Sequence, residues 1–341
     1  MGEVIAGIPF SLEELSGIRP VEDSQQSKEF YWNAAGYRLD GAKVRDLVVK
    51  KLSKLTEQLK SEFKVAPGIG IIQSGDDTAS NTYVSIKERK ATEAGFKVIR
   101  EQYKAGTDQK TLLEKIKEFN TRDDIHGFIV QLPLLPEENF SVEEIISSID
   151  PLKDADCFHP FNVGEFYTGD SYLLAPATAQ GSLIILKVYG VPMADREGRP
   201  YAAAIAGRSD IAGKPFGRVL EAKCNDYNLS YHLMNSRSDT HGIFRSGNYQ
   251  VLVSAVGKIE FTPEDVPHGT PMLIDVGTNF IPNPDPDAKR KTIQCGDFDP
   301  AAYGNARVII PSPGGTGPGT VTALLVNAFN LAAKSAGYRP H

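Results

Sequence analysis

The chain has 341 residues, of which 41% are hydrophobic and 23% are charged, and its formal net charge is −6. This length allows two domains that each bury a core of ordinary size. The acidic balance argues against a nucleic-acid partner, because nucleic-acid binding normally needs a basic face. The apolar runs are all shorter than the roughly 20 residues that a membrane span requires, so we expect no membrane partner.

The cysteine usage indicates a reducing compartment. Cys157, Cys224 and Cys295 are far apart and form no CxxC pair, so they predict neither a disulfide framework nor a zinc site. The first residues lack the charged-then-apolar pattern of a signal peptide. A basic transit peptide is disfavoured by the acidic residues Glu3, Glu13, Glu14, Glu22 and Asp23. We therefore expect a cytoplasmic protein without a resident metal, in which residues 1–35 form an extension.

Short β-branched runs alternate with longer helical stretches, which is typical of an α/β fold with parallel strands. In the first half, the pattern predicts helices over 39–64, 80–94 and 142–149 and strands over 69–72, 96–99 and 128–131. Asp77 and Ser80 are capping candidates for the second of these helices. The residues 156–172 are interpreted as a loop between the two halves.

The second half has the rhythm of a doubly wound sheet. It predicts strands over 201–206, 229–234, 251–256, 272–276 and 308–310 and helices over 178–189, 211–222 and 320–333. We expect an N-terminal α/β domain over 1–175, completed by a returning C-terminal helix over 318–341. The residues 176–317 are expected to form a Rossmann-like, doubly wound dinucleotide domain.

Two side chains that could take part in catalysis share one face of a predicted helix. Tyr83 and Lys87 are four residues apart. A lysine in a cleft can act as a general acid or base when desolvation lowers its pKa. The alternative is a solvated lysine on a charged surface. Gln131 ends a buried strand, where α/β proteins bind ligands, although it could simply cap that strand.

The segment 150–159 holds three carboxylates and a histidine within ten residues. A metal site is one interpretation, but the spacing matches no known set of ligands. We favour a structural or substrate-binding loop. In such a loop, a carboxylate such as Asp156 can accept hydrogen bonds from an amino-heterocycle.

Two glycine-containing loops follow predicted strands. The first runs from Gly207 through Arg208 and Ser209 to Gly213, and its backbone N–H groups at the start of a helix suit a pyrophosphate. Its glycines are six apart, so an ordinary βα loop is the alternative. The second is the stiff, kinked stretch 311–318, which exposes backbone groups to a flat ligand or simply links the sheet to the last helix.

Six segments, taken in order, are similar to the bifunctional methylenetetrahydrofolate dehydrogenase/methenyltetrahydrofolate cyclohydrolase family. They are 67–72 with 75–87, 127–134, 153–160, 207–209, 275–277 and 313–318. The likeness extends over about 39–328, nearly the whole chain. It favours the functional interpretation of each site over the structural one.

The resemblance implies a role for each site residue. Lys87 would be the acid/base of the cyclohydrolase step, Gln131 would hydrogen-bond and tune it, and Tyr83 would stack on or orient the folate. Asp156 would bind the amino edge of the pterin. The loop containing Pro313, Gly314 and Gly315 would line the folate cleft.

The family also implies a dinucleotide site and a homodimer that pairs through the dinucleotide domain. The expected cofactor residues are Gly207, Arg208, Ser209, Gly213, Ser236 and Arg237. An NAD-selective site usually ends its second strand with an acidic residue that holds the ribose hydroxyls. Here that strand is followed by Ser236 and Arg237, which suit a 2′-phosphate, with Arg208 as a second cation. We therefore predict NADP, with NAD as the alternative.

The predicted function is the oxidation of methylenetetrahydrofolate, followed by hydrolysis of the methenyl product to formyltetrahydrofolate. The family usually has glycine at Cys157, and its Pro-Cys-Thr-Pro segment reads Pro176-Ala177-Thr178-Ala179 here. The alternatives are a monofunctional dehydrogenase of the family, a catalytically silent folate- or dinucleotide-binding protein, and a shikimate-type or amino-acid dehydrogenase. The last would not explain why Tyr83, Gln131 and the loop containing Pro313 occur together.

Overall fold

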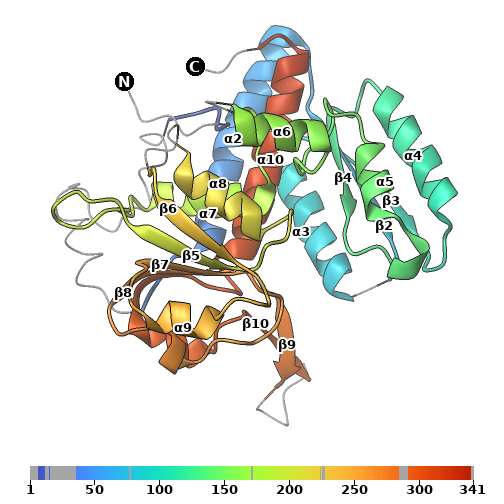
Figure 1. Ribbon diagram of the computed structural model, residues 1–341. Helices are drawn as coiled ribbons and strands as arrows, with labels where there is room; N and C mark the ends of the chain where they lie inside the picture. Colours follow the sequence, from blue (N-terminus) through green and yellow to red (C-terminus); the bar gives the residue numbers. More distant parts are fainter. Residues whose placement is uncertain are drawn as a thin grey trace. The chain divides into compact units, whose positions relative to one another are not determined.

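The computed structural model describes residues 7–11, 15, 36–76, 78–169, 172–222, 224, 227–283 and 291–338 (Figure 1). The chain divides into two compact units. Unit 1 comprises Met1–Ser11, Asp46–Ala177 and Val321–His341, and unit 2 comprises Leu12–Arg45 and Thr178–Thr320. None of the described helices is long and apolar enough to cross a membrane.

Unit 1 is built on a three-stranded parallel sheet in the order β3-β2-β4. The strands are β2 (Gly68–Ser74), β3 (Lys97–Tyr103) and β4 (Gly127–Gln131). The helices with residues in this unit are α2 (Gly41–Phe63), α3 (Thr78–Glu93), α4 (Gln109–Thr121), α5 (Val142–Ser147), α6 (Pro160–Thr168) and α10 (Thr316–Ser335), together with the 3-10 turn η2 (Glu137–Asn139). Every residue of the central strand β2 is buried, as expected for a parallel strand covered on both faces.

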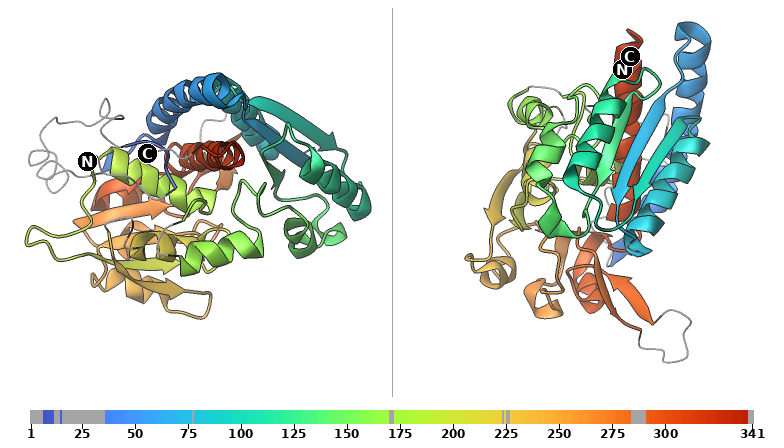
Figure 2. Two further views of the ribbon diagram at one scale, coloured as in Figure 1. Left: turned by 90° about the horizontal axis from the view of Figure 1, so that it is seen from above. Right: turned by 90° about the vertical axis from the view of Figure 1, so that its right-hand side faces the viewer.

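The two faces of this sheet carry different side chains. One face packs Ile72, Phe128 and Val130 against apolar residues of α4 and α5 in a continuous core. The opposite face is covered by α3 and by the C-terminal part of α10, and Figure 2 shows α4 and α3 on opposite sides of the strands. Gly127 allows the close approach of α10, because a Cβ at this position would lie 3.0 Å from Leu331.

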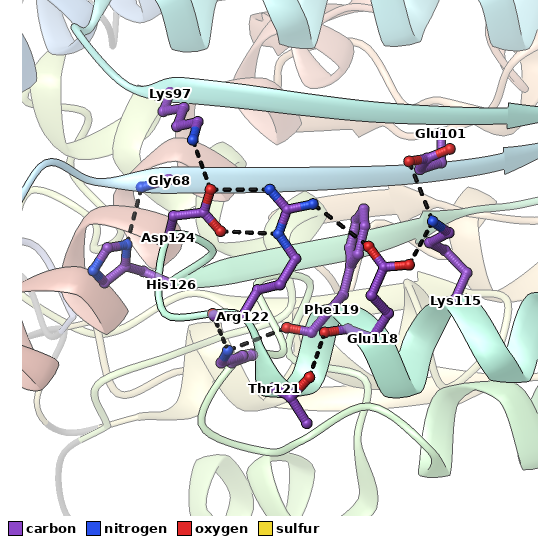
Figure 3. A network of polar contacts seen from close by, with 11 residues as sticks. Gly68, Lys97, Glu101, Lys115, Glu118, Phe119, Thr121, Arg122, Asp124 and His126 are labelled. Carbon is purple, nitrogen blue, oxygen red and sulfur yellow. Dashed lines mark hydrogen bonds and ion pairs between the residues drawn. The ribbon is translucent and has the colours of Figure 1, made fainter.

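A polar network ties α4 to the sheet (Figure 3). Asp124 accepts two hydrogen bonds from Arg122 and one from Lys97, and these cations hold the pKa of its carboxyl well below the usual range. Lys115 of α4 bridges Glu101 of β3 and Glu118 of its own helix. These contacts hold α4 on one face of the sheet and leave the opposite face to α3.

Unit 2 is built on a six-stranded parallel sheet in the order β1-β11-β8-β7-β5-β6. The strands are β1 (Tyr37–Arg38), β5 (Ala202–Ala206), β6 (Ser230–Met234), β7 (Val251–Ser254), β8 (Thr270–Asp275) and β11 (Ala306–Ile310). From β5 the chain first winds to the edge strand β6 and then returns through β7 toward the other edge. The order therefore reverses between β5 and β7, which is where doubly wound proteins bind ligands.

Other elements of unit 2 cover or extend this sheet. They are α7 (Ala177–Val188), α8 (Gly213–Glu221), α9 (Thr240–Arg245), the 3-10 turns η4 (Pro263–Asp265) and η5 (Pro300–Asn305), and the antiparallel hairpin of β9 (Asn279–Pro282) and β10 (Thr292–Cys295). Phe244, Phe261 and Phe298 pack together in the core of this unit.

Most predicted elements are confirmed, and the differences have local causes. The second helix begins at Thr78, so Ser80 lies inside it instead of capping it, and Asp77 lies outside the described residues. The interpretation of 156–172 as a loop was wrong, because it contains α6. His159 caps α6 by accepting a hydrogen bond from the backbone of Phe161, and a proline occupies the first helical position.

Candidate active site

Lys87 and Gln131 meet where α3 crosses the end of β4. Val84 and Ala91 are fully buried on the same side of α3, so Lys87 also points toward the sheet and is only 8% exposed. Its Nζ donates a hydrogen bond of 2.9 Å to Oε1 of Gln131. The Gln131 Nε2 donates to the backbone oxygen of Leu132 at 2.6 Å. This second bond turns the amide so that its oxygen faces the lysine.

The electrostatics of this site involve Lys87 and Asp156. Burial lowers the pKa of Lys87, and the negative charge of Asp156 acts in the opposite direction. Burial raises the pKa of the partly exposed Asp156 to about 6, against the effect of Lys87 and with that of Asp154. The pKa values of both groups are therefore shifted toward neutral pH, which is the range in which a general acid or base works best.

The neighbouring carboxylates of the 150–159 segment have structural partners. Asp154 is 1% exposed and accepts hydrogen bonds from the backbone of His159 at 2.8 Å and from Asn162 at 3.0 Å. Asp150 accepts from the backbone of Leu152 at 2.8 Å. These bonds order the loop that carries Asp156. The described residues contain no cluster of histidine, cysteine and carboxylate groups able to hold a metal ion.

Cys157 occupies a backbone conformation that favours glycine. Its φ is +59°, in the left-handed region, and its side chain is fully buried. Burial and the nearby Asp154 and Asp156 raise the pKa of the thiol well above its usual value. The family resemblance placed a glycine here, and the positive φ gives the physical reason for that preference. This chain keeps the turn with a neutral, buried thiol.

Tyr83 lies one turn before Lys87 on α3 and is half-buried. The structure thus brings Tyr83, Lys87 and Gln131 together on one side of the unit 1 sheet. The Asp156 carboxylate is near enough to act on the lysine charge. The roles that the resemblance implies for these residues remain predictions.

In unit 2, the turn after β5 is tight enough to require glycine at both ends. Gly207 has a φ of +104°, and a Cβ there would lie 2.3 Å from the backbone oxygen of Ala255, which follows β7. A Cβ on Gly213, where α8 begins, would lie 1.8 Å from the Gly207 oxygen. Arg208 and Ser209 are exposed between them. This turn therefore lies where the strand order of the sheet reverses. Its lack of side chains at the two glycines lets a ligand come close to the backbone N–H groups.

The turn after β6 lies beside this glycine turn. The Gly207 N–H donates to the backbone oxygen of Met234 at 3.1 Å, which joins the ends of β5 and β6. The side chain of Asn235 accepts from the backbone of Arg237 at 2.8 Å and shapes the next turn. Ser236 and Arg237 are exposed there. The predicted cofactor residues of the two turns thus share one edge of the unit 2 sheet.

The proline-rich loop is anchored to the end of β8. Thr316 Oγ1 donates to the backbone oxygen of Asp275 at 2.6 Å, and the Ser312 hydroxyl donates to the oxygen of Gly277. Of the predicted site residues in this loop, Pro313 and Gly314 are exposed and Gly315 is buried. The anchors lie at both ends of the loop, and its tip presents backbone groups.

Sequence reasoning missed the role of two buried carboxylates that hold these loops. Asp275 accepts from the backbone of Asp297 at 2.8 Å and from the Tyr303 hydroxyl at 2.8 Å. Burial raises its pKa to about 7, while these hydrogen bonds act in the opposite direction. Asp297 in turn accepts from Ser254 at 2.9 Å and from the backbone of Val256 at 2.8 Å. The sequence signal that could have revealed this role is Asp275, an acidic residue at the end of the apolar strand β8.

The fold and these sites define a two-domain α/β enzyme with a dinucleotide-binding sheet. Residues 39–156 match the catalytic-domain model of tetrahydrofolate dehydrogenase/cyclohydrolase, and residues 176–336 match the NAD(P)-binding-domain model of the same enzymes. The chain therefore belongs to the tetrahydrofolate dehydrogenase/cyclohydrolase family.

Individual relatives agree with this assignment. The chain is 35% identical to the bifunctional protein FolD of Streptococcus sanguinis over 298 residues, covering 87% of this chain and 98% of that protein. It is 36% identical to FolD of Brucella ovis, covering 88% and 97%. The solved FolD of Trypanosoma brucei, complexed with NADP cofactor and inhibitor, is 29% identical with a TM-score of 0.77, covering 87% and 97%. The Campylobacter jejuni enzyme is 27% identical with a TM-score of 0.74, covering 87% and 99%.

The family membership confirms the predicted fold class and function. The protein is a methylenetetrahydrofolate dehydrogenase and methenyltetrahydrofolate cyclohydrolase with an N-terminal catalytic and a C-terminal NAD(P)-binding domain. It is thus an oxidoreductase and a hydrolase of one-carbon metabolism, and its substrates are tetrahydrofolate derivatives.

Proposed function

We propose that Lys87 is the general acid/base of the hydrolysis step and that Gln131 holds it in place. The observation that carries this proposal is the 2.9 Å hydrogen bond between the buried Nζ of Lys87 and an amide oxygen whose orientation is fixed by its own backbone. A neutral amide accepts this bond without forming an ion pair. Gln131 therefore positions the lysine while burial keeps its pKa low.

The hydrolysis step needs a group that moves protons. Water attacks the electrophilic methenyl carbon and loses a proton, and the ring nitrogen that leaves this carbon gains one. Lys87 accepts the first proton and returns one to the nitrogen as the carbon–nitrogen bond breaks. General acid/base groups of this kind contribute about 10²–10⁴-fold to a rate.

The dehydrogenation step needs orientation more than proton transfer. A dinucleotide held by the Gly207–Gly213 turn would supply the hydride acceptor for the methylene carbon, whose two adjacent nitrogens stabilise the resulting cation with their lone pairs. Tyr83 stacks on or orients the folate, and Asp156 accepts hydrogen bonds from the amino edge of the pterin. Pro313, Gly314 and Gly315 present backbone groups to the folate. These contacts set the angle between the methylene carbon and the hydride acceptor.

We propose NADP as the preferred dinucleotide. The tight turn containing Gly207, Ser209 and Gly213 suits the pyrophosphate, because a Cβ on either glycine would meet backbone atoms. Arg208 and Arg237 are exposed cations at the same sheet edge, and Ser236 adds a hydroxyl. The NADP complex of the Trypanosoma brucei relative supports this choice. NAD is the alternative.

The proposed domain roles follow the predicted boundaries, with a catalytic domain over 1–175 and 318–341 and a dinucleotide domain over 176–317. We propose that the enzyme is a cytoplasmic homodimer that pairs through the dinucleotide domain. The hairpin of β9 and β10 offers apolar surface for this pairing, because it exposes Phe280 by 53% on one face and Ile293 by 37% on the other.

A spectrophotometric assay with methylenetetrahydrofolate and each dinucleotide tests the proposed function. We expect reduction of NADP, slower reduction of NAD, and decay of added methenyltetrahydrofolate faster than in buffer. Methenyl accumulation without faster decay would identify a monofunctional dehydrogenase. Absence of both reactions in folded protein would identify a silent binding protein.

A further inference from the structure

Three glutamines form a row across the sheet beneath α3. Gln73 of β2 is the register partner of Gln102 in β3 on one side and of Gln131 in β4 on the other. Register partners on parallel strands point to the same face, so all three side chains lie on the face that α3 covers. Gln131 uses its amide to hold Lys87. The other two glutamines are therefore placed to act on the same helix.

Arg100 joins these other two glutamines to α3. Its NH2 group donates to Oε1 of Gln73 and to Oε1 of Gln102, both at 2.9 Å. Its NH1 group donates to Glu88 at 3.0 Å, and the two side chains are 22% and 28% exposed. Glu88 is the neighbour of Lys87 on the helix. A partly buried guanidinium therefore links the sheet to the residue beside the proposed acid/base.

The same network reaches α3 a second time at Asn81. The Oδ1 of Asn81 accepts from Nε2 of Gln73 at 2.9 Å and from Nε2 of Gln102 at 3.2 Å. Asn81 and Glu88 are seven residues apart, which is two helical turns. Lys87 lies within this span. The helix is thus attached to the sheet at two points, and Arg100 contacts the partners at both.

We propose that Arg100 is a positioning residue for the hydrolysis step. By holding Glu88 and Asn81 directly, and Asn81 also through the glutamines, it sets the depth and rotation of α3 at which the Lys87 Nζ meets Gln131. Without the guanidinium, the buried oxygen of Gln73 loses a donor, and the loss weakens the contact between the sheet and the helix. A shift of about 1 Å at a catalytic group is enough to cost on the order of 10²-fold in rate.

This inference rests on the proposed role of Lys87, so its test includes Lys87→Met as a reference. The test variant is Arg100→Met, which keeps much of the stem and removes the guanidinium. Arg89→Met is the matched control, because Arg89 is on the same helix, 64% exposed, and 4.0 Å from its partner Glu93. Both reactions and the pKa of Lys87 are measured in each variant. The pKa comes from NMR of protein carrying ¹³C at the lysine Cε, with the signal assigned by its loss in Lys87→Met.

We expect Arg100→Met to slow hydrolysis by about tenfold or more and dehydrogenation by less than about threefold. The pKa of Lys87 should rise toward its usual value as the side chain loses its buried position, and the pH profile of hydrolysis should move with it. Arg89→Met should leave all three readouts unchanged. Arg100→Lys should recover part of the rate, since it can pair with Glu88 but cannot reach both glutamines with a planar fork.

Two results would overturn the inference. One is hydrolysis in Arg100→Met within about twofold of the wild-type rate. The other is an equal loss of both reactions with an unchanged pKa of Lys87, which would assign Arg100 a purely structural role. If Arg100→Met does not fold, Glu88→Gln removes the ion pair and should move hydrolysis and the Lys87 pKa in the same directions. If Lys87→Met still hydrolyses, the proposed acid/base is wrong, and the pKa of Lys87 alone decides whether Arg100 positions it.

Discussion

Lys87 and Asp156 act on each other's charge in unit 1, and each favours the ionised form of the other while burial opposes both. The result is a lysine with a lowered pKa beside a carboxyl group with a pKa of about 6. Their titrations are linked, so a change in one group alters the other. This relationship makes the pH dependence of the site informative.

Asp156→Asn should weaken folate binding at neutral pH and remove its pH dependence. A lost charge-assisted pair of hydrogen bonds is worth roughly 1.5–3 kcal/mol. In the wild type, the carboxyl becomes protonated as the pH falls through about 6, so it is a poorer acceptor at lower pH. One titrating proton then predicts an affinity loss of about tenfold between pH 7 and pH 5. Calorimetric titration with an unreactive folate analogue measures this, and parallel pH curves for the two proteins would contradict it.

Arg237→Gln should raise the KM for NADP and spare NAD. Arg237 is exposed at the end of β6, where we place the 2′-phosphate, and a lost charge-assisted contact predicts a change of about tenfold. Lys258→Gln is the control, because Lys258 is a 69% exposed cation of the same unit that pairs with Glu260. Steady-state kinetics with both dinucleotides provide the measurement. An equal rise of the KM for NADP and for NAD would show that Arg237 does not bind the 2′-phosphate.

Tyr303→Phe should loosen the loop that carries Pro313 and Gly314. The Tyr303 hydroxyl donates to Asp275 at 2.8 Å and accepts from the backbone of Ser312 at 3.4 Å. Its removal leaves a buried carboxylate oxygen with one donor fewer, at a cost of about 1–3 kcal/mol in stability. We expect the KM for the folate substrate to rise by about threefold to tenfold.

Tyr249→Phe is the matched control for this change, because its hydroxyl contacts His232 on β6 instead. Thermal denaturation measures the stability, and initial rates measure both KM values. If the KM for folate is equal in Tyr303→Phe and Tyr249→Phe, the Tyr303 hydroxyl does not hold the loop in its folate-binding position.

Much of unit 1 could be predicted because its signals are local. The four-residue spacing of Tyr83 and Lys87 places them on one face of α3, and an amide at the end of a buried strand indicated the carboxyl edge of the sheet. The glycine turn after β5 was also visible, since a strand, a glycine pair and a helix follow each other directly. Each of these features needs only neighbouring residues and the period of a helix or strand.

The remainder depends on strand register and on distant contacts. Arg100 and Gln73 are far apart in sequence, and only the pairing of β2 with β3 brings them together. Asp275 meets Asp297 and Tyr303 across the hairpin of β9 and β10, which has no local motif. The positive φ of Cys157 was also hidden, because a cysteine gives no signal for a left-handed turn. These positions are set by tertiary packing.

In the proposed mechanism, Lys87 is required for the hydrolysis step and dispensable for the hydride transfer. Hydride transfer moves no proton to the protein, whereas hydrolysis needs a titrating group beside the methenyl carbon. Lys87→Met keeps most of the stem and cannot carry a proton. The most direct measurement assays methenyl hydrolysis and NADP reduction on one preparation of this variant, with circular dichroism to confirm its folding. We predict that hydrolysis falls by about 10²–10⁴-fold while dehydrogenation and dinucleotide binding persist. Hydrolysis at nearly the wild-type rate would contradict the account.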